Sequence, residues 1–179
     1  MHEVLEQVGK IGIVPVVVLE DAKDALPLAK ALCDGGLPCA EITFRTEAAE
    51  ESIRLLSREY PQMLVGAGTV LTTEQAERAT AAGAKFLVSP GTNPQVVKYC
   101  VENHLLITPG CANPSDIEQA LENGLDVVKF FPAELAGGLA MIQALAAPYV
   151  NVKFMPTGGI HPGNAGEYLK YERVLACGG

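Results

Sequence analysis

The chain has 179 residues, of which 49% are hydrophobic, and a formal net charge of −8. This length allows a sizeable core, and we expect residues 1–179 to form one domain. The acidic balance argues against nucleic-acid binding, which needs clustered Lys and Arg, and no apolar run is long enough to span a membrane.

Short apolar runs rich in β-branched residues recur along the chain, each followed by a loop and an amphipathic helical segment. Their spacing of roughly twenty to twenty-six residues is that of a compact βα unit. The predicted strands are Ile11–Leu19, Cys39–Phe44, Met63–Gly66, Phe86–Ser89, Leu105–Thr108, Val127–Phe131, Val152–Met155 and Arg173–Cys177.

Helix boundary signals fall between these runs. Asp21 is a cap for the first helix, and Gly35 and Gly36 end it. Thr72 followed by Gln75 is a capping-box pattern. Two further helices are predicted to begin with an Asn cap and a proline at the first helical position, at Asn93-Pro94 and Asn113-Pro114.

Eight alternating units predict an α/β fold, a closed (β/α)₈ or TIM barrel. The alternative is an open Rossmann-like or flavodoxin-like sheet, but no G-x-G-x-x-G motif follows the first strand. The sequence stops at Cys177-Gly178-Gly179, where the eighth strand ends, so the eighth helix is missing. We expect either that the native chain continues or that the C-terminus is truncated.

The cysteines indicate a reducing compartment. Their number is odd and none forms a C-x-x-C pair, so we interpret them as free thiols in the cytoplasm. No basic-then-apolar leader opens the chain, which also argues against secretion. They are Cys33, Cys39, Cys100, Cys111 and Cys177.

Lys129 is the most informative charged residue. It lies late in a predicted strand, where strand alternation places Val127, Lys129 and Phe131 on one face. In a barrel, catalytic residues gather at the carboxyl ends of strands. An ammonium between Val and Phe is costly to desolvate, so its pKa should fall and leave a free amine for Schiff-base chemistry. The alternative is a lysine that reaches solvent or pairs with a carboxylate.

Glu41 and Arg45 share a face of the second predicted strand with Thr43. A buried carboxylate there can transfer protons, and a guanidinium can bind a substrate carboxylate in bidentate fashion. The alternative is a simple Glu41–Arg45 ion pair at the strand end.

Glycine-rich turns follow several strands. Gly158-Gly159 comes after the seventh strand, where barrels often bind phosphate through backbone N–H groups, and Gly178-Gly179 closes the eighth in the same way. The turn Gly66–Leu71 permits close approach at the third strand. We expect no metal site, because the three histidines show no ligand spacing, and no cofactor.

Together these segments resemble a known family. Glu41–Thr46, Gly66–Val70, Ser89–Gly91, Val128–Glu134 and Pro156–Ile160 occur in the order typical of the 2-keto-3-deoxy-6-phosphogluconate (KDPG) aldolases. Many members also act on 4-hydroxy-2-oxoglutarate (KHG). The resemblance extends from about Val14 to Gly179, and Lys129-Phe130-Phe131-Pro132-Ala133-Glu134 is its most specific stretch.

The resemblance implies a class I aldolase, a lyase that takes a phosphorylated 2-keto acid sugar. Lys129 would form the Schiff base, and Glu41 would be the general acid/base. Arg45 and Thr69 would hold the pyruvate moiety, in a pocket shaped by Pro90.

The family also implies that the backbone of Gly158 and Gly159 binds the 6-phosphate. It further implies a metal-free homotrimer of carbohydrate metabolism that acts in the Entner–Doudoroff pathway. The sequence departs from the family after Gly179, where a phosphate-binding serine and the eighth helix usually follow.

Three alternatives stay open at this point. Two are aldolases that share the pyruvate end of the substrate and act on 4-hydroxy-2-oxoglutarate or on 2-dehydro-3-deoxy-6-phosphogalactonate. The third is a non-catalytic phosphosugar-binding barrel, since fold alone does not fix function.

Overall fold

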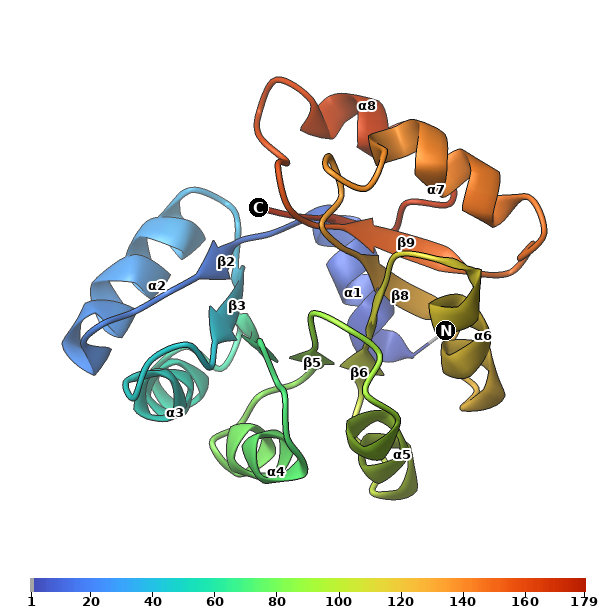
Figure 1. The fold of residues 1–179 in the computed structure, drawn as a ribbon. Coiled ribbons are helices and arrows are strands. Elements are labelled where there is room, and N and C mark those ends of the chain that lie inside the picture. Colours follow the sequence, from blue (N-terminus) through green and yellow to red (C-terminus); the bar gives the residue numbers. More distant parts are fainter. Residues whose placement is uncertain (1) are drawn as a thin grey trace.

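Parallel strand segments form a closed ring in the computed structural model, which describes residues 2–179 (Figure 1). Every pair of neighbouring strands is parallel, as the βα repeat predicts. The segments are β1 Ile13–Val14, β2 Val16–Val17, β3 Cys39–Thr43, β4 Leu64–Gly68, β5 Leu87–Val88, β6 Ile107–Thr108, β7 Gly110–Cys111, β8 Val127–Phe130, β9 Lys153–Pro156 and β10 Cys177–Gly178.

Two barrel strands are each divided in two by a proline. Pro15 separates β1 from β2, and Pro109 separates β6 from β7, because proline has no N–H to give to the ladder. β1 pairs with β10 and β2 with β3, so the first strand closes the ring. The proline carbonyls still accept hydrogen bonds, from the N–H of Glu41 at 2.8 Å and of Lys129 at 2.9 Å.

Helices α2 to α8 lie outside the strands as an incomplete ring, and the C-terminus lies between α2 and α8 (Figure 1). The bounds are α2 Ala25–Asp34, α3 Ala49–Glu59, α4 Thr73–Ala81, α5 Pro94–Glu102, α6 Pro114–Glu122, α7 Gly138–Ala146 and α8 Ala165–Leu169, with a 3₁₀ turn, η1, at Ala22–Asp24. This arrangement confirms the predicted (β/α)₈ barrel without an eighth outer helix in residues 2–179.

The predicted helix caps are confirmed, with two differences in detail. Asp21 caps η1, which leads into α2. The Thr72 hydroxyl accepts from the N–H of Gln75, but the Gln75 amide oxygen accepts from the N–H of Leu71 instead of Thr72. This second bond fixes the segment that leaves β4. The asparagine caps of α5 and α6 form as expected, each before a proline.

Alternation along the strands divides the core into an inner and an outer part. Outward side chains such as Ile42 and Phe130 pack beneath the surrounding helices. Inward side chains near the strand starts, such as Cys39 and Val127, form a separate cluster inside the ring. Because alternate residues share a face, Glu41 and Lys129 also point inward.

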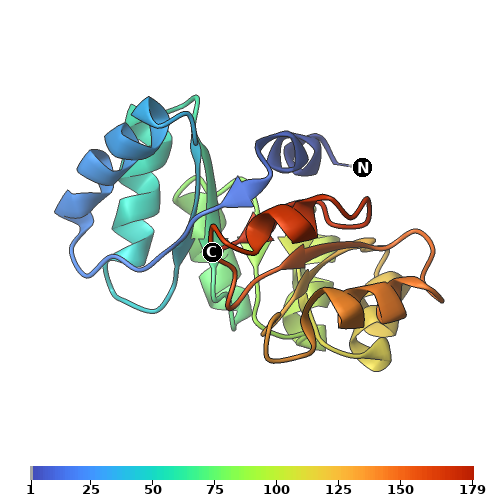
Figure 2. The same ribbon diagram turned by 90° about the horizontal axis from the view of Figure 1, so that it is seen from above.

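A helix that the strand analysis did not predict, α1 Glu3–Ile11, closes the amino-terminal end of the barrel. Leu5 and Val8 are buried in the inner cluster against Phe86 and Val127. In Figure 2 this helix lies at one end of the strands, apart from the surrounding helices. The predicted first strand began at Ile11, but that residue ends α1, and the strand starts at Ile13.

Within residues 2–179, none of the helices is both long and apolar enough to cross a lipid bilayer.

Candidate active site

Lys129 and Glu41 meet inside the barrel from different strands. Lys129 comes from β8 and Glu41 from β3, and 3.9 Å separates Nζ of Lys129 from Oε1 of Glu41. Their side chains are only 4% and 3% exposed. Of the two alternatives for the lysine, the structure therefore excludes the solvent-exposed one and realises a carboxylate pair, held in the barrel interior.

Burial shifts both groups toward their neutral forms. Desolvation lowers the pKa of the Lys129 amine, and the nearby Arg45 charge lowers it further against the opposing effect of Glu41. Desolvation also raises the pKa of the Glu41 carboxyl, while Lys129 and Arg45 oppose this rise. The arrangement therefore favours a free amine beside a carboxyl group that can give or take a proton.

Phe131 follows Lys129 on the same side of the chain, and its ring centroid lies 4.9 Å from Nζ. The ring covers the amine with apolar surface, which contributes to its desolvation. Glu41 Oε1 has no hydrogen-bond partner in residues 2–179, and 3.9 Å to Nζ exceeds hydrogen-bond length. This arrangement suits addition of the amine to a carbonyl group. The free carboxylate oxygen can then exchange a proton with the hydroxyl group that the addition forms.

Arg45 and Thr69 form the next part of the site. The Nε–H of Arg45 donates to the Thr69 hydroxyl over 3.1 Å, which joins the segments that follow β3 and β4. The ion pair of Glu41 within 4.0 Å is with Lys129, so the alternative of a Glu41–Arg45 pair is not what the structure has. Thr69 has φ +55, a left-handed conformation that a β-branched residue rarely adopts.

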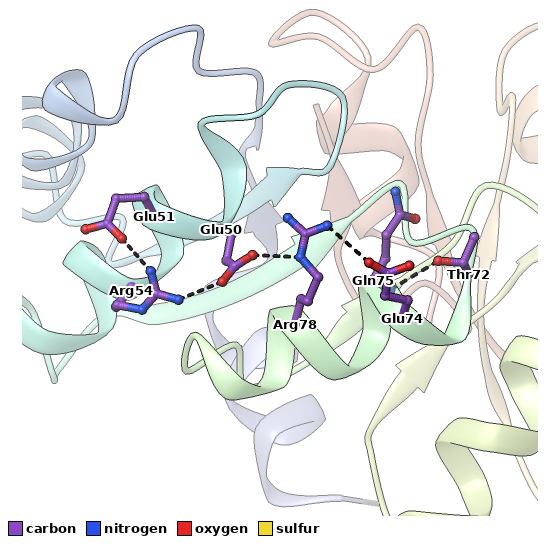
Figure 3. Close-up of polar contacts among 7 residues, drawn as sticks. All are labelled: Glu50, Glu51, Arg54, Thr72, Glu74, Gln75 and Arg78. Atoms are coloured by element: carbon purple, nitrogen blue, oxygen red, sulfur yellow. Dashed lines mark hydrogen bonds and ion pairs between the residues drawn. The ribbon is translucent and has the colours of Figure 1, made fainter.

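Polar side chains of α3 and α4 pair with one another across the interface of the two helices (Figure 3). Glu50 of α3 pairs with Arg54 and, across the helix interface, with Nε of Arg78 at 2.7 Å. The Arg78 guanidinium also lies over the ring of Phe44, 5.9 Å from its centroid. Phe44 directly precedes Arg45, so α4 supports this side of the site as well as the turn after β4.

Pro90 lies half-buried in the turn after β5, which rests on β7. The Thr92 hydroxyl donates to the carbonyl of Gly110 over 2.8 Å. A Cβ on Gly110 would lie 2.7 Å from the N–H nitrogen of Gly91, and nearer still to the Pro90 carbonyl. Only glycine lets the two turns pack this closely.

Gly158 and Gly159 follow β9, both with left-handed φ, at +99 and +78. The N–H of Glu134 donates to the Gly158 carbonyl over 3.1 Å, and the Asn164 side chain donates to the Gly159 carbonyl over 3.0 Å. The Tyr168 hydroxyl in turn donates to the Glu134 carboxylate. The Tyr168–Glu134 contact is not predicted from the sequence, because a tyrosine on a helix is usually a packing residue.

One surface cleft, of about 320 Å³, lies beside the turn that follows β9 and is lined by residues that include Ile160, His161 and Gly179. The other clefts lie away from the candidate site. Two clefts, of about 120 and 330 Å³, lie between α1 and the starts of β5, β6 and β8. This is the end of a barrel that serves stability and not chemistry. In the part of the chain that the structure describes, no three His, Cys, Asp or Glu side chains are placed to hold a metal ion. The buried Lys129–Glu41 pair therefore identifies the candidate site.

Comparisons with known proteins identify relatives of this chain. The sequence profile of the family described as KDPG and KHG aldolase matches residues 4–179. A 2-dehydro-3-deoxy-phosphogluconate aldolase of Treponema pallidum (strain Nichols) is 55% identical over 179 residues, which cover 100% of this chain and 85% of that protein.

Solved structures of such enzymes are also similar. The KDPG aldolase of Zymomonas mobilis ZM4, crystallised with 3-phosphoglycerate, superposes with a TM-score of 0.94 at 42% identity, over 98% of this chain and 84% of that one. The KDPG aldolase of Legionella pneumophila, with pyruvate captured as a covalent carbinolamine intermediate, has a TM-score of 0.94 at 39% identity. That match covers 98% of this chain and 85% of the other.

Proposed function

The chain belongs to the KDPG and KHG aldolase family, and we propose that Lys129 and Glu41 carry out its Schiff-base chemistry. The enzyme is a class I aldolase, an aldehyde-lyase that cleaves 2-dehydro-3-deoxy-6-phosphogluconate to pyruvate and glyceraldehyde 3-phosphate. The single observation that supports the residue assignment is the buried Lys129 amine, 3.9 Å from an unpartnered Glu41 oxygen.

The proposed mechanism begins with the free amine of Lys129, which adds to the C2 ketone of the substrate. Glu41 moves the protons by which the carbinolamine loses water and becomes an iminium. The iminium then accepts the electron pair of the C3–C4 bond as Glu41 removes the C4 hydroxyl proton. Glyceraldehyde 3-phosphate leaves, and the remaining enamine is protonated and hydrolysed to pyruvate.

The remaining site residues bind the two ends of the substrate. We propose that Arg45 and Thr69 hold the carboxylate and keto end in a pocket that Pro90 shapes. Two observations support this proposal. Arg45 and Thr69 share a hydrogen bond of 3.1 Å. The Arg45 charge also lowers the pKa of both Glu41 and Lys129. Gly158 and Gly159 would bind the phosphate through the backbone, and the left-handed φ of both residues forms the required turn.

Covalent trapping tests the assignment of Lys129. Treatment with pyruvate and borohydride should add the mass of one reduced pyruvate imine, and peptide mapping should place it on Lys129. A Lys153→Ala variant is the matched control, because Lys153 is also a strand residue, the first of β9. The assignment is wrong if Lys129→Ala still traps pyruvate, or if the adduct maps to another lysine.

A second substrate, 4-hydroxy-2-oxoglutarate, is favoured by the description of the matching family, which includes KHG aldolases. It shares the pyruvate end and lacks the phosphate. Comparing kcat/KM for the two substrates, with pyruvate release coupled to lactate dehydrogenase, decides between them. A Gly159→Ala variant, which is strained at φ +78, should lose activity mainly on the phosphorylated substrate.

We further propose that residues 1–179 form a single domain that assembles as a homotrimer in the cytoplasm and acts in an Entner–Doudoroff-type pathway. Five free cysteines, four of them buried, support a reducing compartment. Leu135 is 91% exposed, which suits a residue covered by another copy. Light scattering after gel filtration measures the assembly, and a monomer would contradict the proposed trimer.

A further inference from the structure

The Glu41 carboxylate lies directly against Gly68 on the neighbouring strand. In the β3–β4 register Glu41 is opposite Gly66, and Thr43 is opposite Gly68. The Glu41 side chain therefore leans toward the carboxyl end of the barrel and reaches the position two residues along β4. It is 2% exposed there, and Oε1 accepts no hydrogen bond from any residue in 2–179.

A side chain at residue 68 would occupy the space that this carboxylate fills. A Cβ built on Gly68 lies 2.6 Å from Cδ and 2.7 Å from Cγ of Glu41, and closer still to Oε1. Rotation of the carboxylate alone cannot relieve this overlap, because it involves three consecutive atoms. The φ of Gly68 lies outside the left-handed region, so its backbone would accept alanine. The need for glycine comes from the glutamate.

We propose that Gly68 is a positioning residue for Glu41, one that places the carboxylate by leaving room for it instead of by hydrogen bonding. This inference rests on the proposed role of Glu41 as the general acid/base. A carboxylate held by N–H donors would have those lone pairs occupied and its charged form stabilised. The space above Gly68 instead fixes the location of the Glu41 carboxylate. It leaves Oε1 free for the substrate hydroxyl and for the water released during iminium formation.

A cycle of variants tests the coupling. Gly68→Ala should displace the carboxylate and lower kcat by about 100-fold, with KM little changed, because about 1 Å of misplacement costs this much. In a Glu41→Ala background the overlap is gone, so Gly68→Ala should change the residual rate by less than about 2-fold. Additive losses in the two backgrounds would overturn the inference.

Glu41→Asp provides a background that keeps the coupling measurable if Gly68→Ala alone does not fold. Aspartate places its carboxyl carbon near the present Glu41 Cγ, 2.7 Å from the built Cβ, so the overlap persists in part. Gly68→Ala should therefore lower kcat in the Glu41→Asp background and leave kcat unchanged in the Glu41→Ala background. Equal effects in both backgrounds would mean that Gly68 does not act through Glu41.

Gly66→Ala is the matched control, from the same strand and the same inward face. The added Cβ would lie 2.6 Å from Cδ2 of Phe86, so this variant should lower stability. It should leave unchanged the limb of the kcat–pH profile that titration of Glu41 sets. Gly68→Ala should shift that limb; an unshifted limb contradicts the inference. If Glu41→Ala itself retains full activity, the proposed function of Glu41 fails. If Glu41→Ala loses activity and Gly68→Ala retains full activity, the proposed role of Glu41 stands and the positioning role of Gly68 fails.

Discussion

At the scale of single residues, burial of Lys129 lowers the stability of the fold and keeps its amine uncharged for Schiff-base formation. The amine is desolvated between Val127 and Phe131 and pairs with Glu41 at 3.9 Å, beyond hydrogen-bond length. Methionine has nearly the same shape and no charge. We therefore expect Lys129→Met to abolish pyruvate trapping and to raise the unfolding free energy by about 1 kcal/mol at a pH where Glu41 is protonated, because removing one member of a buried pair destabilises only when the other stays charged.

The pH dependence of this gain has a definite sign. Because the folded-state pKa of Lys129 is depressed below its ordinary 10.5, its contribution to stability is present above pH 10.5 and is lost as the pH falls through the folded-state pKa. Without Lys129, the pKa of Glu41 rises further, because the lysine charge no longer opposes the desolvation of the carboxyl. Urea unfolding should show a larger gain at pH 6 than at pH 9; the reverse order would contradict the proposed depression.

Thr69 is a second residue whose conformation opposes stability. A β-branched residue at φ +55 is strained, whereas asparagine adopts this region more readily. Thr69→Asn should stabilise the fold by about 0.5 to 1 kcal/mol, since it relieves part of that strain. Loss of the hydroxyl that accepts from Arg45 should raise the Kd for pyruvate, measured by the concentration dependence of trapping. A variant that is less stable and binds pyruvate normally would refute both expectations.

Sequence reasoning reached part of this residue-level picture. Strand alternation was enough to place Glu41 and Lys129 on inward faces, because the period of two holds in any strand. The left-handed φ of Thr69 and the space above Gly68 could not be predicted. The space above Gly68 depends on which residue of the neighbouring strand lies opposite, and a single sequence does not contain the register. A left-handed φ at a threonine has no local signal in the sequence.

At the scale of elements, the strand prediction located the units but not their limits. The predicted strand 63–66 is β4 Leu64–Gly68, and the predicted 173–177 contains only the start of β10. Residues before β10 contribute an isolated bridge between Val174 and Phe154. The strand prediction does not include helix α1, although Val4, Val8 and Ile11 repeat at helical spacing, because it assigns Ile11 and the apolar run after it to the first strand.

The α3–α4 interface makes a prediction about Arg78. Its guanidinium joins Glu50 and the ring of Phe44, but it is 44% exposed, so the ion pair contributes little by itself. We expect Arg78→Ala to lower Tm by only a few degrees, by less in high salt, and to weaken pyruvate binding by about 3-fold through the Phe44–Arg45 segment. Arg58→Ala is the control, because within residues 2–179 Arg58 pairs only with its neighbour Glu59. Equal effects of the two variants on pyruvate binding would exclude this support of the site.

At the scale of the whole molecule, the two ends of the barrel have different tasks. The amino-terminal end is closed by α1, whose Leu5 and Val8 enter the inner apolar cluster. The residues proposed to bind substrate lie at or beyond the carboxyl ends of the strands, as Arg45 does after β3 and Thr69 after β4. A barrel keeps these functions apart because each strand has its packing at its start and its chemistry at its end.

This separation predicts that stability can be reduced at one end without loss of function at the other. Val8 is fully buried, so Val8→Ala should lower the unfolding free energy by about 2 kcal/mol through the lost methyl groups and the cavity they leave. The matched control, Val150→Ala, removes a valine that is 68% exposed and should change stability by less than about 0.5 kcal/mol. Urea midpoints measure both variants. Activity per folded molecule should stay at the native level in each, because Val8 lies at the amino-terminal end of the barrel and Lys129 lies late in β8. A fall in kcat for Val8→Ala, measured well below its unfolding transition, would show instead that α1 sets the geometry of the catalytic pair through the barrel interior.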